Sequence, residues 1–303
     1  MNNEEQVVLY TETMDLTALR IFKTVAEQGG ITKAAAKLHR VQSNVTTRVK
    51  QLEAQLGTQL FLRHKRRLVL SSEGKVLLAY ADRLLRLSSE AEDALRSGGP
   101  RGALRVGALE STAAARLPPL LSRYHLAYPG VRLELATGTT GALIARVLSG
   151  ELDAAFAAEP FAPDGLETCP AFSEELVLIT PRSLAKVKAP KDIGNRTLLA
   201  FATGCSYRRL LETWLGRYDV VPERVMEFAS YHAIVACTAA GSGVAVVPRS
   251  VLRAMRAEKE VTIHELPRSA SKTRTLLVWR AGYQSSPLDA MRAVLASIRR
   301  GEK

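Results

Sequence analysis

Three helical segments near the N-terminus constrain the fold of this chain more than any other feature. Apolar residues recur every three or four positions from Leu16, as on one face of an amphipathic helix, and Gly29-Gly30 is expected to end that helix. Thr32 is then expected to cap a short, alanine-rich helix through its hydroxyl. A turn at 39–41 separates this helix from a third one, which ends at Gly57. The order of helix, short helix, tight turn and polar helix is typical of a helix-turn-helix.

The third helix has an apolar face and a polar face. Its apolar positions have helical spacing and are expected to face a core: Val45, Val49, Leu52 and Leu56. The polar face carries short hydrogen-bonding side chains and cations, which can contact base edges in a DNA major groove. The residues expected to read bases are Gln42, Ser43, Asn44, Thr46, Thr47 and Lys50. A polar face on an isolated helix is more often simply solvated, so the preceding short helix and turn are what favour DNA contact.

A basic hairpin is expected directly after these helices. Residues 60–70 form two short apolar strands around a basic tip, which is typical of the wing of a winged helix-turn-helix. Residues 14–75 contain 12 Lys and Arg against 4 Asp and Glu, within a chain of formal net charge +12. This basic density suits a polyanionic partner. The residues expected to contact DNA phosphates are Thr32, Lys33, Arg48, Arg63, Lys65, Arg66 and Arg67.

The third helix and its surroundings carry a long sequence motif. The chain carries A-A-K-L-H-x-x-Q-S-N-V-T-T-R-V-x-Q-L-E-x-x-L-G-x-x-L-F-x-R, followed by L-S-S-E-G. This motif resembles that of the LysR-type transcriptional regulators, whose turn reads roughly S-Q-P-A-V-S-R-x-I. Val41, Ser43, Asn44 and Thr47 depart from that pattern on the base-reading surface, so the operator sequence is not carried over. Met14-Asp15-Leu16 resembles the family's usual beginning, so residues 1–13 are expected to be an extension or to reflect the choice of start codon.

A long linker helix is expected from Ser71-Ser72-Glu73 to about Arg96, before Gly98-Gly99-Pro100 breaks the chain. Its apolar residues follow a coiled-coil seam: Leu77, Tyr80, Leu84, Leu87, Ala91 and Ala94. The alternative is a single amphipathic helix that lies on its own domain. Pairing is favoured, because a two-fold dimer would present two recognition helices to a palindromic DNA site. The family resemblance implies that such dimers can pair again into tetramers.

Strands and helices alternate in residues 101–303, which predicts a parallel sheet covered by helices and then a second α/β lobe. A last strand at 276–279 and a helix at 288–298 are expected to return to the first lobe. Two such lobes resemble periplasmic binding proteins, the fold of LysR-type effector domains. The expected divisions are a winged helix-turn-helix at 14–72, a linker helix at 73–97, a hinge at 98–102, and an effector domain at 103–303, with lobe I at about 103–171 and 270–300 and lobe II at about 172–269.

A small-molecule site is expected where strands of the two lobes end and helices begin. The residues expected to line it are Ser111, Thr112, Thr139, Thr140, Cys205, Ser206, Tyr207, Arg208, Tyr231 and His232. Hydroxyls and amides at helix starts, with Arg208, favour a small carboxylate effector. The stretches G-C-S-Y-R-R and S-Y-H also resemble a branch of the family that includes putrescine-utilisation regulators. A polyamine would need an acidic partner, for which Glu110 is the obvious candidate.

Other functions fit the sequence less well. Ser206 or Cys205 with His232 could suggest an enzyme, but no G-x-S-x-G, Walker or H-E-x-x-H motif is present, so no catalytic centre is expected. No cofactor or metal site is expected either, because Cys169, Cys205 and Cys237 have no metal-ligand spacing. A thiol sensor based on Cys205 is the main alternative regulator. A free solute-binding protein is disfavoured by the basic N-terminal module.

The expected partners are promoter DNA, a small polar effector, a second copy of the chain and RNA polymerase. No membrane partner is expected, because no apolar run approaches the roughly 18 residues of a membrane span. The N-terminal residues are acidic and lack the profile of a secretory signal, so the cytoplasm is the expected compartment.

Overall fold

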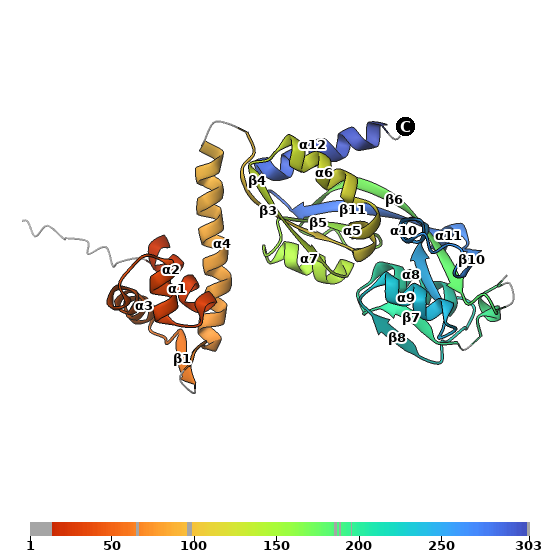
Figure 1. Cartoon of the computed structure of the whole chain (residues 1–303), viewed down its shortest axis with the longest axis horizontal. Coiled ribbons are helices and arrows are strands. Elements are labelled where there is room, and N and C mark those ends of the chain that lie inside the picture. Colours follow the sequence, from red (N-terminus) through yellow and green to blue (C-terminus); the bar gives the residue numbers. More distant parts are fainter. Residues whose placement is uncertain are drawn as a thin grey trace, which may run out of the picture. The chain divides into compact units, whose positions relative to one another are not determined.

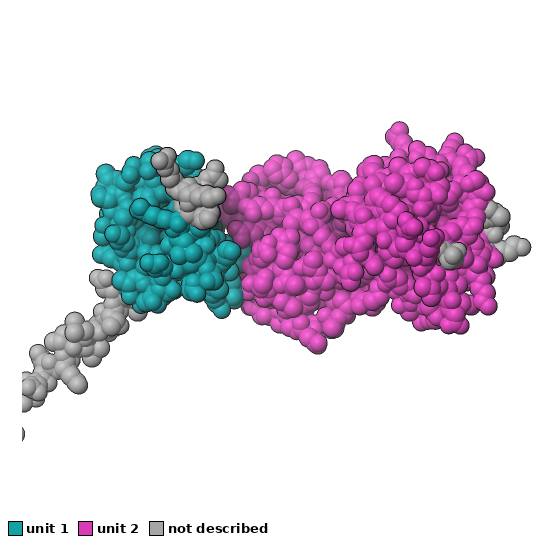
Figure 2. Space-filling view, turned by 90° about the horizontal axis from the view of Figure 1, so that it is seen from below, with its two compact units in different colours: residues 1–96 teal, residues 97–303 magenta. Residues whose placement is uncertain are grey.

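The computed structural model describes residues 14–64, 67–95, 99–184, 187, 189–194 and 196–301 (Figure 1). The chain divides into two compact units, residues 1–96 and 97–303 (Figure 2). Within the described ranges, no helix is both long enough and apolar enough to cross a membrane. The fold class expected from the sequence, a helix-turn-helix followed by a two-lobed α/β domain, is confirmed.

The first unit begins with three helices whose ends follow from their capping residues. Their bounds are α1 (Leu16–Gln28), α2 (Ile31–Lys37) and α3 (Gln42–Leu56). The Asp15 carboxylate accepts the Ala18 N–H at 2.6 Å and caps α1. Gly29 and Gly57 end α1 and α3 with φ of 65° and 64°, a backbone conformation that glycine adopts without strain.

Two sequence-based expectations for these helices are wrong. Thr32 does not cap α2, because the helix begins at Ile31 with Gly30 in the cap position, and no side chain caps it. Thr32 therefore lies inside the first turn, with an exposed side chain. Leu56 does not face the core and is 41% exposed, because the last turn of α3 reaches beyond the contact with α1 to a surface groove beside the fourth helix.

The wing is a two-stranded antiparallel hairpin, β1 (Phe61–His64) and β2 (Arg67–Leu70), with Phe61 opposite Leu70. The Glu53 carboxylate fixes the hairpin to α3 by accepting the N–H groups of Leu60 and Phe61 at 2.8 and 3.2 Å. The Phe61 ring packs on Phe22 of α1 with a centroid distance of 5.3 Å. Since these contacts bury the apolar side of the hairpin, the position of the wing relative to α3 is set by the core.

The linker helix α4 (Ser72–Leu95) follows the wing directly. The Ser71 hydroxyl accepts the Gly74 N–H at 2.8 Å and donates to the Gln59 carbonyl at 2.7 Å, which anchors the first turn of the helix. One face of α4 packs on the core of α1 through Leu77, Leu78, Ala81 and Leu85. The start of the long helix was predicted to within one residue.

The first lobe of the second unit is a mixed sheet. Its strands β3 (Gly102–Ala108), β4 (Val131–Thr137) and β5 (Ala154–Ala158) are parallel, as the alternation of strands and helices predicts. The last strand, β11 (Lys272–Arg280), returns and pairs antiparallel with β5, also as predicted. The lobe also contains the helices α6 (Leu117–Ala127), α7 (Thr140–Leu148) and α12 (Ser286–Gly301), which lie against this sheet together with a short helix after β3 (Figure 1).

Strand β6 (Leu166–Thr180) joins the two lobes. Its first part pairs with β11, and its last part, from Leu176, pairs with β9 (Ala245–Pro248) and β10 (Thr262–Glu265) in the second lobe. The sequence of residues 166–175 does not indicate a strand, because half of them are polar and they show no strand alternation. The lobe also contains β7 (Leu198–Phe201), β8 (Val225–Phe228), α8 (Ser206–Gly216), α9 (Tyr231–Ala239), α10 (Arg249–Met255) and α11 (Arg268–Ser271), and a 3₁₀ turn (Pro190–Asp192).

Residues 110–127 form two helices and not one continuous helix. A short α5 (Glu110–Ala115) ends at Arg116, and α6 begins at Leu117. Pro118 and Pro119 lie in the first turn of α6, where prolines are tolerated because the amides there have no helical acceptor. The break places Glu110 and Ser111 at the start of α5, directly after β3, where the two lobes meet.

Candidate functional site

The polar face of α3 is open to solvent. Gln42, Ser43, Asn44, Thr47 and Lys50 are all exposed, opposite the buried residues of the same helix. Thr46 is half-buried, and its hydroxyl donates to the Gln42 carbonyl at 2.9 Å. Most of the predicted base-reading set therefore lies on one accessible surface.

The residues expected to contact phosphates lie on α3 and on the elements around it. Thr32 and Lys33 are exposed on α2, Arg63 on β1 and Arg48 on α3, where Arg48 lies 4.0 Å from the Asp15 carboxylate. Among the described residues, no carboxylate lies within 4 Å of Lys33, Lys50 or Arg63, so these charges are available to a polyanion. Lys65, Arg66 and the side chain of Arg67 lie outside the described residues.

The outer face of α4 carries an apolar stripe. Val76, Tyr80, Leu84 and Leu87 follow one another at helical spacing and are 59%, 55%, 38% and 62% exposed. The first three border a groove of about 500 Å³ that also contains Met14 and Leu56. A stripe of this kind on one helix is a typical self-association surface.

The predicted seam on α4 is largely the exposed stripe. Ala91 is exposed, while the side chain of Ala94 lies outside the described residues. Leu77 lies at the edge of the stripe, because its side chain packs partly on the core of α1. Val76 was missed, although its spacing of four from Tyr80 could have indicated it.

In the second unit, six of the predicted effector residues line one small cavity between the lobes: Ser111, Thr139, Cys205, Ser206, Tyr207 and Tyr231. Leu109, Glu110, Gly138 and Phe201 complete its wall. Glu110 was expected from the sequence only as the acidic partner of a polyamine. Phe201 was not expected, because its approach depends on the packing of the second lobe. The cavity has a volume of about 10 Å³.

The lobes contact each other around this cavity. The Ser206 hydroxyl of the second lobe donates to the Ala158 carbonyl of the first at 2.8 Å, and the Gly141 N–H donates to the Gly204 carbonyl at 3.3 Å. The Thr140 hydroxyl donates to the same Ala158 carbonyl at 3.3 Å. The cleft is thus closed, and its two walls are held by hydrogen bonds from helix starts.

The remaining predicted effector residues lie outside the small cavity. Thr140 and Arg208 line an adjoining pocket of about 580 Å³, which shares Cys205 and Ser206 with the small cavity. Thr112 is buried but lines neither space, and His232 is exposed and lines neither.

The Arg208 guanidinium does not face the small cavity, contrary to the expectation of an inward arginine. It is bound by the carboxylates of Glu212 at 2.7 Å and Glu227 at 2.6 Å, and it donates to the Phe201 carbonyl at 3.1 Å. These two ion pairs raise the pKa of Arg208 further above its ordinary value. The two ion pairs explain why the Arg208 guanidinium points away from the small cavity. An arginine between two carboxylates is stabilised more by pairing with them than by facing the cleft.

Burial controls the protonation of the cavity residues. Desolvation raises the pKa of Tyr207 and of Tyr231, so both phenols stay neutral at physiological pH. Burial also raises the pKa of Glu110, opposed by a hydrogen bond from the Tyr231 N–H and by the charge of His232. Burial raises the pKa of the Cys205 thiol more than the N–H groups of Arg208 and Tyr207 lower it. Cys205 is therefore a poor thiolate nucleophile.

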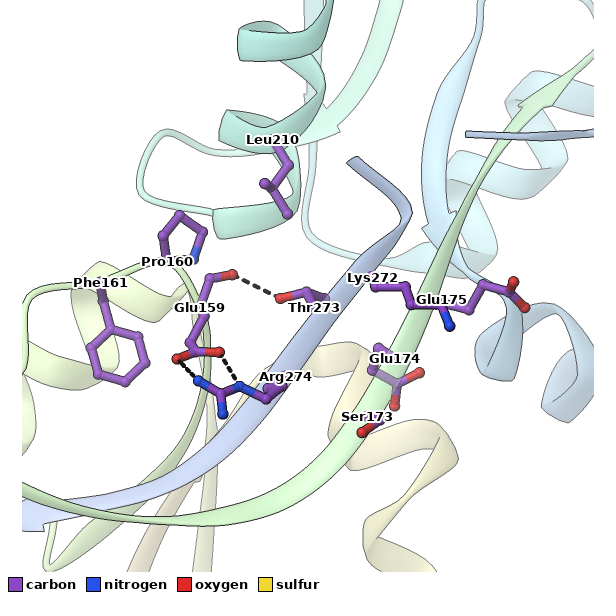
Figure 3. A pocket seen from close by; sticks show the side chains of 10 residues that line it. All are labelled: Glu159, Pro160, Phe161, Ser173, Glu174, Glu175, Leu210, Lys272, Thr273 and Arg274. Atoms are coloured by element: carbon purple, nitrogen blue, oxygen red, sulfur yellow. Dashed lines mark hydrogen bonds and ion pairs between the residues drawn. The ribbon is translucent and has the colours of Figure 1, made fainter. Parts of the chain in front are cut away.

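A larger and more open pocket, of about 810 Å³, lies beside the strands that join the lobes (Figure 3). Most of its charged side chains have partners: Arg274 makes two hydrogen bonds of 2.7 Å with Glu159, and Glu175 binds Arg249 at 2.8 Å. The Thr273 hydroxyl donates to the Glu159 carbonyl at 2.9 Å. The buried Glu174 carboxylate is bound by Arg116 and by Ser250. Because these groups are paired, the pocket offers a ligand fewer free polar groups than the small cavity does. Across the described residues, no three His, Cys, Asp or Glu side chains are grouped to hold a metal ion.

Comparisons with known proteins identify similar proteins for both units. Residues 16–75 match the family of bacterial regulatory helix-turn-helix proteins of the lysR type, and residues 97–302 match the LysR substrate binding domain. The chain is 43% identical to the uncharacterized HTH-type transcriptional regulator YusT of Bacillus subtilis, over 88% of this chain and 90% of YusT. It is 37% identical to the HTH-type transcriptional regulator GltR of Bacillus subtilis, over 94% and 96% of the two chains.

Solved structures of full-length regulators resemble the whole chain. A variant of full-length OxyR from Pseudomonas aeruginosa is 26% identical, with a TM-score of 0.70 over 94% of this chain and 95% of that one. Full-length CbnR in complex with its target DNA is 25% identical, with a TM-score of 0.69 over 94% and 99% of the two chains. The same two units therefore occur together in a protein whose structure contains its DNA target.

Proposed function

The chain belongs to the LysR family of DNA-binding transcriptional regulators, and we propose that it reads an operator through α3 and responds to a small effector bound between the two lobes. The observation that carries this proposal is the exposed polar face of α3 beside unpaired cations of the same unit. The domain divisions expected from the sequence, with a linker helix and a hinge between the DNA-binding and effector domains, are part of the proposal. So is contact with RNA polymerase.

The coupling we propose uses the closed cleft. An effector that binds between the lobes adds contacts to the closed arrangement, which shifts its population. The linker helices of an assembled dimer or tetramer then change their relative placement, and with it the spacing or bend of the bound DNA. Such coupling is reciprocal, so operator DNA and effector should change each other's affinity by the same factor.

The alternatives find no support in the geometry. A catalytic serine would need a base nearby, but the Ser206 hydroxyl donates to a backbone carbonyl and His232 is exposed outside the cavity. A redox switch at Cys205 would need a reactive thiolate, and burial raises the pKa of this thiol. A sensor that returns its effector unchanged fits these residues better.

Substitutions on α3 and on the wing should affect DNA binding in different ways. We expect Thr47→Ala to change the preference at particular base pairs, with a discrimination loss of about 1–3 kcal/mol at those positions. We expect Arg63→Ala to weaken binding to all sequences and to lower the slope of log affinity against log salt by about 1. Fluorescence anisotropy on a library of operator variants over a salt series measures both effects.

Each of these two variants is the control for the other, because both remove one exposed side chain from the same unit. Uniform weakening by Thr47→Ala, without a change of base preference, would contradict the assignment of α3 as the recognition helix.

A further inference from the structure

At three of the helices that begin around the effector cavity, amides of the first turn already have acceptors within the protein. At α9 the Tyr231 N–H donates to the Glu110 carboxylate. At α8 the first amides point to the Cys205 sulfur. At α7 the Thr139 hydroxyl and the Gly204 carbonyl accept the N–H groups of the first turn, at 3.4 and 3.3 Å. These amides of the anion cradle expected from the sequence are therefore already bound within the protein.

The nearby arginines are occupied as well. Arg208 is held by Glu212 and Glu227, and Arg209 donates to the Pro160 carbonyl. Among the described residues, no Lys or Arg lines the small cavity, and its one charged side chain is Glu110. An anionic ligand group at this position would meet a carboxylate without a compensating cation, which is costly in a buried site.

The atoms that remain unpaired are oxygens. The second carboxylate oxygen of Glu110 (Oε2) is buried, and within the described part of the chain it has no hydrogen-bond partner. The buried Ser111 and Tyr207 hydroxyls lie close to each other, but neither has a partner of ordinary geometry among the described residues. Ser111 and Tyr207 are each only 3% exposed and line the cavity. Buried polar atoms of this kind normally have partners. An ionised carboxylate oxygen only accepts, so a ligand group that donates hydrogen bonds would complete Glu110, and the two hydroxyls can accept from the same group.

The size and the walls of the cavity favour the same kind of group. Its volume of about 10 Å³ is enough for one water-sized group, such as an ammonium, whereas a carboxylate, with three heavy atoms, would require the lobes to open. The Phe201 and Tyr231 rings, with centroids 4.7 Å apart, form part of the wall. Aromatic faces attract cations in addition to the charge of a carboxylate.

We propose that the effector carries a primary ammonium group, which binds in the closed cavity against Glu110, Ser111 and Tyr207, while its remainder occupies the adjoining pocket of about 580 Å³. This inference rests on the proposed function, because it concerns the ligand of the sensing cleft. It departs from the carboxylate expected from the sequence, because Arg208 and Arg209 are paired within the protein and Glu110 is the one charged side chain in the wall of the small cavity.

The experiment compares three probes of equal length, propylammonium chloride, 1-propanol and sodium propionate, on the full chain at matched ionic strength. For millimolar affinity, propylammonium at about 20 mM is expected to raise the melting temperature by about 3 °C, and 1-propanol and propionate by less than half of that. Glu110→Gln keeps the shape of the side chain and removes its charge, so this substitution should abolish the shift. Tyr207→Phe should reduce the shift, because it removes one acceptor.

Glu151→Gln is the matched control, because Glu151 is an exposed first-lobe glutamate that binds Arg146 away from the cavity. This variant should keep the full shift. A larger shift with propionate than with propylammonium would overturn the proposal, as would an equal propylammonium shift in Glu110→Gln or no shift with propylammonium in the unmodified chain.

Operator binding by the same unmodified preparation distinguishes a wrong effector class from a wrong proposed function. If propylammonium fails while sequence-specific DNA binding is present, only the effector class is wrong. If DNA binding is absent, the proposed function itself is wrong.

Discussion

Replacing Leu84 by glutamate is expected to halve the number of chains in the assembly and to weaken operator binding by about 100-fold or more. Leu84 lies in the exposed apolar stripe of α4, between Tyr80 and Leu87, and borders the groove of about 500 Å³. If this stripe pairs with its copy, two new carboxylates would be buried near the two-fold axis without a partner, which costs several kcal/mol. Each separated chain can then bind at most one half of a palindromic operator.

Light scattering coupled to gel filtration measures the number of chains, and anisotropy measures the affinity. Val221→Glu is the control, because Val221 is 76% exposed and lies outside α4. The control should keep the assembly intact. An unchanged assembly in Leu84→Glu would show that α4 lies alone on its own unit, which was the alternative interpretation of the seam.

Gly74→Ala is expected to destabilise the first unit by about 3 kcal/mol and to lower its melting transition by about 15 °C. A Cβ on Gly74 would lie 2.1 Å from the Leu60 carbonyl oxygen and 3.0 Å from the Leu70 side chain. Since the nearest atom belongs to the backbone, the conflict cannot be relieved by a side-chain rotation. The first turn of α4 would have to move away from the wing, which disturbs the hydrogen bond from Gly74 N–H to the Ser71 hydroxyl.

Differential scanning calorimetry of the full chain measures this prediction through the transition of the first unit. Gly216→Ala is the matched substitution, because Gly216 is an exposed helical glycine of α8 whose added Cβ would meet no atom within 4 Å. Its effect should be neutral or stabilising by about 0.5–1 kcal/mol. An unchanged first-unit transition in Gly74→Ala would mean that α4 does not approach Leu60 as described.

The parts of the fold that could be predicted are those determined by local chemistry. Gly29 and Gly57 end their helices, and alternating strands and helices indicate the parallel strands of the first lobe, because capping and periodicity act over a few residues. The first half of β6 could not be predicted. Its polar residues are held by pairing with β11, which is distant in the sequence.

In the effector cavity, too, some features follow from the local sequence and others depend on distant contacts. The hydroxyls of Ser111 and Ser206 could be placed at helix starts from the sequence. The pairing of Arg208 with Glu227, and the occupation of the α9 amide by Glu110, depend on contacts between distant segments. These contacts determine the charge of the cavity, so the ligand class expected from composition differs from the one that the geometry favours.

The measurement that tests the central claim most directly is fluorescence anisotropy of the full chain with DNA from the intergenic region upstream of its own gene, over a salt series and with unrelated DNA as competitor. We expect binding that survives the competitor and falls steeply with salt, as in an operator-reading regulator with several phosphate contacts. Weak binding that unrelated DNA removes completely would contradict operator recognition by α3 at this site.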